Sequence, residues 1–125
     1  MKNTFKKTER LCSVKVIDSL FDRKNTANEG VFTYPARVVF RKSEDNVTQV
    51  LFSVPKRQFK HAVDRNLIKR RMKEAYRLNK TLLAGNFYIT FIYVGKKIEE
   101  YDAIVKGIKS ALKKINNSQQ ISANL

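Results

Sequence analysis

The 125-residue sequence predicts a single small α/β (α+β) sandwich in which one mixed sheet packs against two long helices. Three observations favour this fold class: two β-rich runs beside a polar turn, a continuous run of β-branched and aromatic residues, and a C-terminal segment of helical periodicity. The apolar fraction of 42% lies within the range of folded proteins, and the length suits one hydrophobic core. We expect the element order helix, strand, strand, helix, strand, helix, in one domain spanning residues 1–125.

The N-terminal part of the chain predicts one short helix. Residues 1–12 are polar and basic, and we expect them to be flexible. Ser13 offers an N-cap to the helix, whose apolar residues fall on one side. The following segment, 22–35, is rich in turn residues and predicts a loop. The apolar residues of the helix are Val14, Ile17, Leu20 and Phe21.

Three strands are expected in the middle of the chain. Residues 36–42 and 48–54 flank a polar turn, and Pro55 stops the second run, so we expect an antiparallel hairpin. The third strand, 87–94, is apolar on both faces, which is typical of a central buried strand.

Two long helices complete the fold. The first contains the basic run 65–77, and the chain breaks this pattern at residues 84–86. In the second, apolar residues recur at i, i+3, i+4 and i+7 from Tyr101, and they predict a helix from about residue 99 to 116. The polar end of the chain, 117–125, is expected to be flexible.

The charge balance predicts a polyanionic partner. With 26 Lys plus Arg against 11 Asp plus Glu, the net charge is +15 and the pI is about 10.2, and nucleic acid is the commonest partner of such a surface. No apolar run reaches the length of a transmembrane helix, and the start lacks a secretory signal. Cys12 is the only cysteine, which excludes an intramolecular disulfide and a cysteine-rich zinc site. We expect a cytoplasmic protein without a membrane partner.

The basic run 65–77 predicts an RNA-binding helix. Its cations share one face, while Ile68, Met72 and Ala75 lie on the other, so the helix packs on the sheet and presents its charge outward. An ordinary solvated face alternates Glu with Lys, whereas the column at every fourth residue here is like-charged, and Glu74 is expected to point elsewhere. The residues expected to contact RNA are Lys56, Arg57, Arg65, Asn66, Lys69, Arg70, Lys73 and Arg77.

This part of the sequence resembles the protein subunit of bacterial ribonuclease P. The resemblance is carried by residues 52–57 (FSVPKR), 62–70 (AVDRNLIKR) and 73–77 (KEAYR), and it extends over about residues 8 to 116. The family's signature is a strand ending in Ser-Val-x-Lys-Lys, followed by a helix carrying Arg-Asn-x-x-Lys-Arg. The resemblance implies the fold of the second domain of ribosomal protein S5.

The resemblance also implies a function. The protein would join a catalytic RNA that holds the active site and binds most of the Mg²⁺, and together they would remove the 5′ leader from precursor tRNA by endonucleolytic cleavage. A cleft between the first helix and the sheet would hold the single-stranded leader. The residues expected to line this cleft are Ile17, Phe21, Phe40 and Ser53.

No catalytic or metal-binding residue is expected in the protein itself, because no cluster of carboxylates or histidines is visible. His61 has no partner for hydrolysis nearby, and the buried aromatics of 87–94 suit a core better than a stacking surface. The main alternative is a ribosomal-type structural RNA-binding protein with no role in cleavage. A helix-turn-helix DNA binder is disfavoured, since a strand rather than a helix precedes the basic helix. A nuclease that acts alone is disfavoured by the missing carboxylate cluster.

Overall fold

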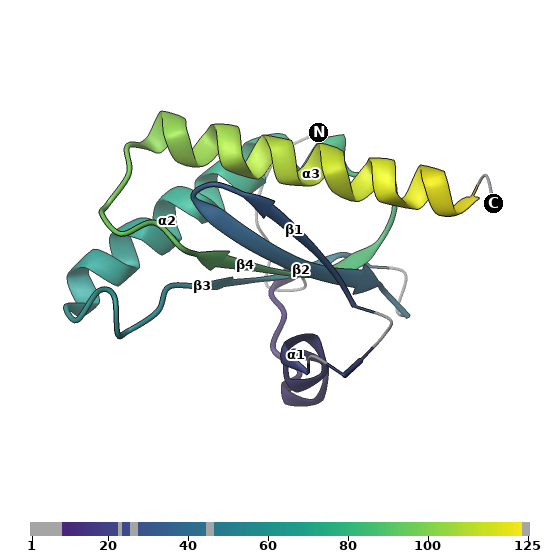
Figure 1. The fold of residues 1–125 in the computed structure, drawn as a ribbon, viewed down its shortest axis with the longest axis horizontal. Coiled ribbons are helices and arrows are strands. Elements are labelled where there is room, and N and C mark those ends of the chain that lie inside the picture. The colour runs from purple at the N-terminus through teal and green to yellow at the C-terminus, as the bar shows by residue number, and fades with distance from the viewer. Residues whose placement is uncertain (1–8, 23, 26–27, 45–46, 124–125) are drawn as a thin grey trace.

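The chain folds into three layers around one four-stranded sheet, with two long helices on one face and a short helix on the other (Figure 1). The computed structural model describes residues 9–22, 24–25, 28–44 and 47–123. The helices and strands are α1 (Val14–Phe21), β1 (Glu29–Thr33), β2 (Ala36–Lys42), β3 (Gln49–Ser53), α2 (Ala62–Asn79), the 3₁₀ turn η2 (Lys80–Leu82), β4 (Phe87–Tyr93) and α3 (Tyr101–Ala123).

The sheet confirms the expected mixed topology but corrects two details. Its strand order is β1-β2-β4-β3, with β3 parallel to β4 and the other pairs antiparallel. The expected hairpin between β2 and β3 is wrong, because β4 lies between them. The segment expected to be a loop contains β1, which pairs with β2 from Glu29 opposite Phe40 to Thr33 opposite Ala36.

The main core lies between the sheet and the pair α2 and α3. Successive residues of β2 alternate, so Ala36, Val38 and Phe40 point into this core while their neighbours point to the α1 side. β4 is buried along almost its whole length, as expected of a central strand. Aromatic rings fill the middle of the core, where the Phe52 and Phe91 rings stack at 5.5 Å.

α1 covers only part of the opposite face. Ser13 is its N-cap, as expected, and the Ser13 hydroxyl accepts a bond of 3.4 Å from the Val16 amide. Beneath the helix lies a small cluster of Leu11, Leu20 and Tyr88. α1 is therefore held by far fewer buried side chains than α2 or α3.

The segment just before α1 is placed against the edge strand β3, which corrects the expected flexibility for residues 9–12. The Leu11 amide donates to the Val50 carbonyl at 3.0 Å, and the Leu11 side chain is 2% exposed. A salt bridge of 2.8 Å joins Glu9 to Lys80 at the end of α2. Residues 1–8 lie outside the described residues.

α3 is longer than expected, since it runs to Ala123 rather than ending near residue 116, and residues 124–125 lie outside the described part. It packs closely on the turn between β1 and β2, where a Cβ at Gly107 would lie 2.8 Å from the Tyr34 carbonyl oxygen. Among the described helices, none is both long enough and apolar enough to cross a bilayer.

Candidate nucleic-acid interface

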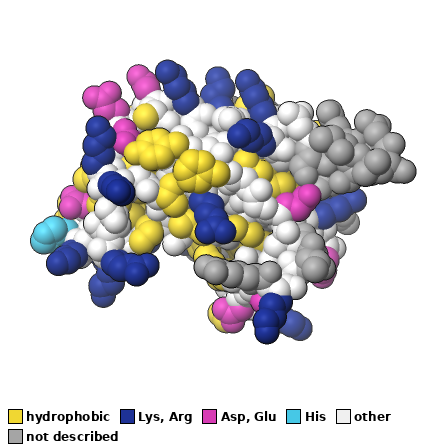
Figure 2. All heavy atoms as spheres, in the orientation of Figure 1, with side chains coloured by type: hydrophobic (Ala, Val, Ile, Leu, Met, Phe, Trp, Pro, Cys, Tyr) yellow, Lys and Arg dark blue, Asp and Glu magenta, His cyan; other side chains and the backbone are white. Residues whose placement is uncertain are grey.

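α2 sits on the sheet in the orientation that its sequence predicts. Ile68, Met72, Ala75 and Tyr76 are buried against the core, at 2% exposure or less. Asn66 and Arg70 are exposed, and the other four predicted contacts on the helix are half-buried: Arg65, Lys69, Lys73 and Arg77. Lys and Arg side chains are spread widely over the surface seen in Figure 2.

The cations of α2 lie on two flanks rather than on one face. Lys69 and Lys73 border a cavity of about 300 Å³ beside β3, together with Arg10 from the segment before α1. Arg70 lies on the other flank, near Tyr101 at the start of α3. The positive surface therefore wraps around α2, and the flank at β3 is extended by Arg10, which the sequence did not single out.

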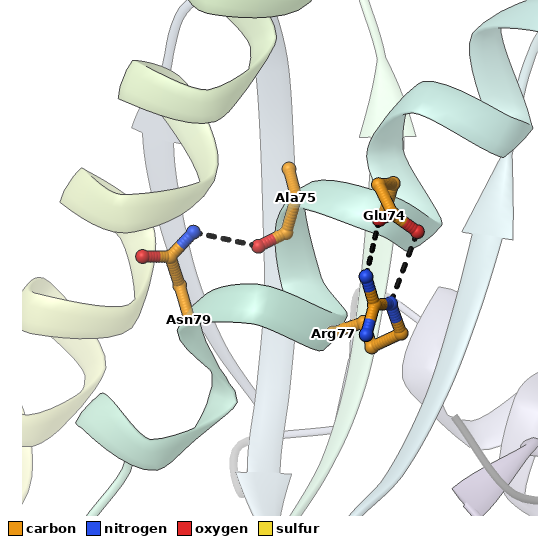
Figure 3. A network of polar contacts seen from close by, with 4 residues as sticks. All are labelled: Glu74, Ala75, Arg77 and Asn79. Atoms are coloured by element: carbon orange, nitrogen blue, oxygen red, sulfur yellow. Dashed lines mark hydrogen bonds and ion pairs between the residues drawn. The ribbon is translucent and has the colours of Figure 1, made fainter. Parts of the chain in front are cut away.

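Glu74 is not remote from the cations, contrary to expectation. Its carboxylate accepts two hydrogen bonds from the Arg77 guanidinium one turn along the helix, and Asn79 donates to the Ala75 carbonyl at 2.8 Å (Figure 3). The hydrogen bond from Arg77 holds the pKa of Glu74 below its ordinary value. The like-charged column thus ends in an ion pair, so Arg77 presents less net positive charge than its neighbours.

The connector between β3 and α2 is a tight turn that exposes cations. The Pro55 carbonyl accepts from the amides of Gln58 and Phe59, at 3.2 and 3.1 Å, and this turn leaves Lys56 and Arg57 exposed. Phe59 is 7% exposed and packs on Tyr93, which fixes the turn to the core.

Arg65 has a structural role beside its charge. Its Nη1 donates to the carbonyl oxygens of Phe59 and Lys60, at 2.8 and 2.9 Å, so the guanidinium holds the connector against the first turn of α2. The Gln58 side chain also donates to the Lys96 carbonyl at 3.3 Å. This contact brings two exposed lysines, Lys96 and Lys97, to the connector, and sequence reasoning did not assign them to the surface.

The sheet face that α1 leaves open carries a row of side chains. Strand register places Phe32 opposite Arg37, Arg37 opposite Ile92, and Ile92 opposite Ser53, so all four point to the α1 side. Beside this row, a cavity of about 420 Å³ opens between the end of α1 and the sheet, and Phe21 lines it.

Of the four predicted cleft residues, three lie on the α1 side of the sheet and one does not. Phe21 is 48% exposed and lines the cavity, Ile17 packs against the small cluster, and Ser53 lies on the open face. Phe40 is wrong, because it is 0% exposed on the face covered by α2 and α3, where its ring packs edge-on against Phe87.

Arg41, the next residue along β2, lies on the face of the sheet where Phe40 was expected. Arg41 points to the α1 side, lies over the Tyr88 ring at 5.3 Å, and donates to the Ser19 hydroxyl of α1. A strand places alternate residues on opposite faces, so an offset of one residue moves a side chain across the sheet. The signal that identifies Arg41 is thus the period of two along β2, once one face is known to be buried.

The remaining polar candidates form no catalytic arrangement. His61 is the N-cap of α2, is exposed, and makes no capping bond with its side chain. Cys12 is an exposed free thiol. In the part of the chain that the structure describes, no three His, Cys, Asp or Glu side chains come together as a metal site.

Comparisons with known proteins agree on one family. The sequence profile of ribonuclease P matches residues 5–116. A ribonuclease P protein component of Porphyromonas gingivalis is 32% identical over 127 residues, which cover 94% of this chain and 90% of the relative. Another, from Chlorobium phaeobacteroides, is 40% identical over 83 residues, covering 65% of this chain and 57% of the relative.

Solved structures share the fold. The chain is similar to the RNase P protein of Thermotoga maritima with a TM-score of 0.71 at 22% identity, covering 85% of this chain and 96% of that one. It is similar to the RNase P protein of Staphylococcus aureus with a TM-score of 0.69 at 20% identity, covering 86% and 94%. At these identities the likeness establishes the arrangement of the elements.

Proposed function

The chain belongs to the ribonuclease P protein family, endoribonuclease subunits that partner an RNA in tRNA processing, and from this premise we propose that its two surfaces bind two different RNAs. One surface, which we term the docking surface, would bind the catalytic RNA. The other, the open face of the sheet beside α1, would bind the 5′ leader of precursor tRNA. The docking surface consists of Lys56, Arg57, Arg65, Asn66, Lys69, Arg70, Lys73 and Arg77.

The docking surface suits a folded RNA because it combines several kinds of donor. Exposed Arg70 offers a planar fork for phosphate oxygens, Lys69 and Lys73 act as point charges, and exposed Asn66 can bond a base edge or a 2′-hydroxyl. Arg65 is already bonded to the connector, so it would position Lys56 and Arg57 as well as add charge.

The open face suits a single strand. Phe21 offers a partly exposed ring on which a base can stack, and Ser53 offers a hydroxyl on the strand that leads into the connector. The observation that carries the proposal is this continuity: Ser53 ends β3 on the open face, and Lys56 and Arg57 follow it on the docking surface. An RNA strand that leaves the docking surface therefore enters the open face directly.

In this proposal the RNA subunit holds the active site, and Mg²⁺ is bound by the RNA subunit and the substrate. The complex works in the bacterial cytoplasm. The protein contributes positive charge between two polyanions. Neutralised phosphates repel one another less, so the complex needs fewer free cations to assemble. We expect the protein to matter most at low Mg²⁺ and moderate salt.

Reconstitution tests the proposal. The protein is mixed with the host's candidate catalytic RNA and precursor tRNA at low Mg²⁺, and release of the 5′ leader is measured. We expect cleavage with both components and almost none with the protein alone. Equal cleavage with and without the protein at all Mg²⁺ concentrations would contradict an assisting role, and cleavage by the protein alone would contradict an active site in the RNA.

The salt dependence of RNA binding tests the docking surface. Log affinity falls as log salt rises. Replacing Lys69 and Lys73 with Ala should make this fall shallower, by about 0.7 to 0.9 in slope for each phosphate that the protein no longer neutralises. The matched control removes the same charge from α3, where Lys109 and Lys113 are exposed, and should leave the slope closer to that of the original protein. Equal slopes in the two variants would show that only net charge matters.

A further inference from the structure

The row Phe32, Arg37, Ile92 and Ser53 crosses the whole sheet, and its outer half extends beyond the proposed leader site. Ser53 and Ile92 lie on β3 and β4, while Arg37 and Phe32 lie on β2 and on the edge strand β1. α1 covers the neighbouring positions, such as Val39 and Leu51, but not this row. The row is therefore an open track from the docking surface to the far edge of the sheet.

Phe32 stands out among the surface side chains. It is 59% exposed, and a single exposed apolar residue by itself needs no explanation. Phe32, however, lies directly opposite Arg37 across the β1–β2 ladder, so an aromatic ring and a guanidinium sit side by side on one face. Figure 2 shows hydrophobic side chains gathered among Lys and Arg on the side where β1 faces the viewer.

Arg37 is available to a ligand. It is exposed, and it has no hydrogen bond or ion-pair partner among the residues that the structure describes. The lining of the neighbouring cavity of about 420 Å³ includes Arg37 and Asp22. The Asp22 carboxylate disfavours a phosphate inside the cavity, so a phosphate is expected at Arg37 and an uncharged base in the cavity.

We infer that the leader continues across the sheet to β1, with a base stacked on Phe32 and a phosphate at Arg37. This inference rests on the proposed leader function of the open face. Three strand spacings of about 4.8 Å separate Ser53 from Phe32, a span of roughly 14 Å. A stacked nucleic-acid strand rises about 3.4 Å per nucleotide. A leader that reaches Phe32 therefore needs up to roughly four more nucleotides than one that reaches only Ser53.

A series of precursor tRNAs with leaders of increasing length tests the inference in the reconstituted holoenzyme. We expect Phe32→Leu, which keeps an apolar edge strand but removes the ring, to weaken binding by about fivefold or more for long leaders, the lower end of one base–aromatic stack. Short-leader precursors and mature tRNA should bind as they do to the original protein. Phe32→Tyr should restore long-leader binding, because it restores the ring.

Two further variants distinguish failure of the extended track from failure of the proposed leader function. Tyr34→Leu removes an exposed aromatic that is outside the row and bonded to Glu99, and it should change nothing at any leader length. Phe21→Ala should weaken binding of all precursors relative to mature tRNA. If Phe21→Ala has this effect but Phe32→Leu has none, or the same effect at every length, the extended track is wrong and the proposed function stands. If no variant distinguishes precursor from mature tRNA, the leader function itself fails.

Discussion

The two faces of the sheet are built from the same strands but bury very different amounts of side chain. On the face covered by α2 and α3, residues such as Val38 and Phe91 are 0% exposed and belong to one large core. On the α1 face, the buried hydrophobic residues among those described form a cluster of three, and Phe32 at the edge is 59% exposed. The side chains that stabilise the fold and those proposed to bind the leader thus lie on opposite faces of one sheet.

This separation determines how a substitution acts. A side chain on the covered face should affect folding and leave RNA preference unchanged in the folded fraction. A side chain on the α1 face should affect RNA binding with a smaller loss of stability. Three substitutions test this division, in decreasing order of expected effect.

Phe40→Ala should cause the largest loss of stability. Truncation of a wholly buried Phe removes its packing against Phe87 and leaves a cavity, which costs about 3–5 kcal/mol. Urea unfolding measures this, with Phe32→Ala as the control on the open face, where we expect no more than about 1 kcal/mol. Similar losses in both variants would mean that the faces are not distinct.

Leu20→Ala should release α1 while the sheet stays folded. Leu20 is 3% exposed and is one of the three buried residues that hold the helix, so we expect a loss of about 2–3 kcal/mol. Hydrogen exchange should accelerate at the amides of α1 and not at those of β4. Equal acceleration in both elements would show that α1 and the sheet unfold as one unit.

Arg41→Ala should have the smallest effect on stability. The Arg41 guanidinium ties β2 to α1 through Ser19 and lies over the Tyr88 ring, an arrangement that contributes about 0.5–1 kcal/mol near the surface. Arg37→Ala removes the same charge four residues away, where no described residue pairs with it, and should leave the melting temperature unchanged. A larger drop in melting temperature for Arg37→Ala than for Arg41→Ala would show that Arg41 does not stabilise the contact between β2 and α1.

Short-range patterns in the sequence, namely helix caps and apolar periodicity, correctly predicted α1, β2 and the buried side of α2. The Ser13 cap and the apolar side of α1 indicated a helix that starts at Val14, and the run 36–42 matches β2 residue for residue. The buried residues of α2 follow from the helical period, because Ile68, Met72 and Ala75 return to one side every three or four positions.

Features that depend on long-range pairing were not predicted. β2 and β3 are neighbours in sequence, which favours a hairpin, but β4 pairs with both of them from more than 30 residues away. β1 was not predicted because turn residues precede, interrupt and follow it, such as Asn28, Gly30 and Pro35. Phe40 and Arg41 differ by one position, and which of them faces the core is fixed by the helices that cover one face.

The central position of β4 has a consequence for synthesis. During translation β2 and β3 emerge without the strand that joins them, and the sheet closes only after Tyr93 has been made. α2, which ends at Asn79, is complete before that point. Since pairing between distant segments is slow to form, the nascent chain presents its most basic segment before its own core can hold it. The growing protein therefore exposes a charged, incompletely folded segment until β4 has been made.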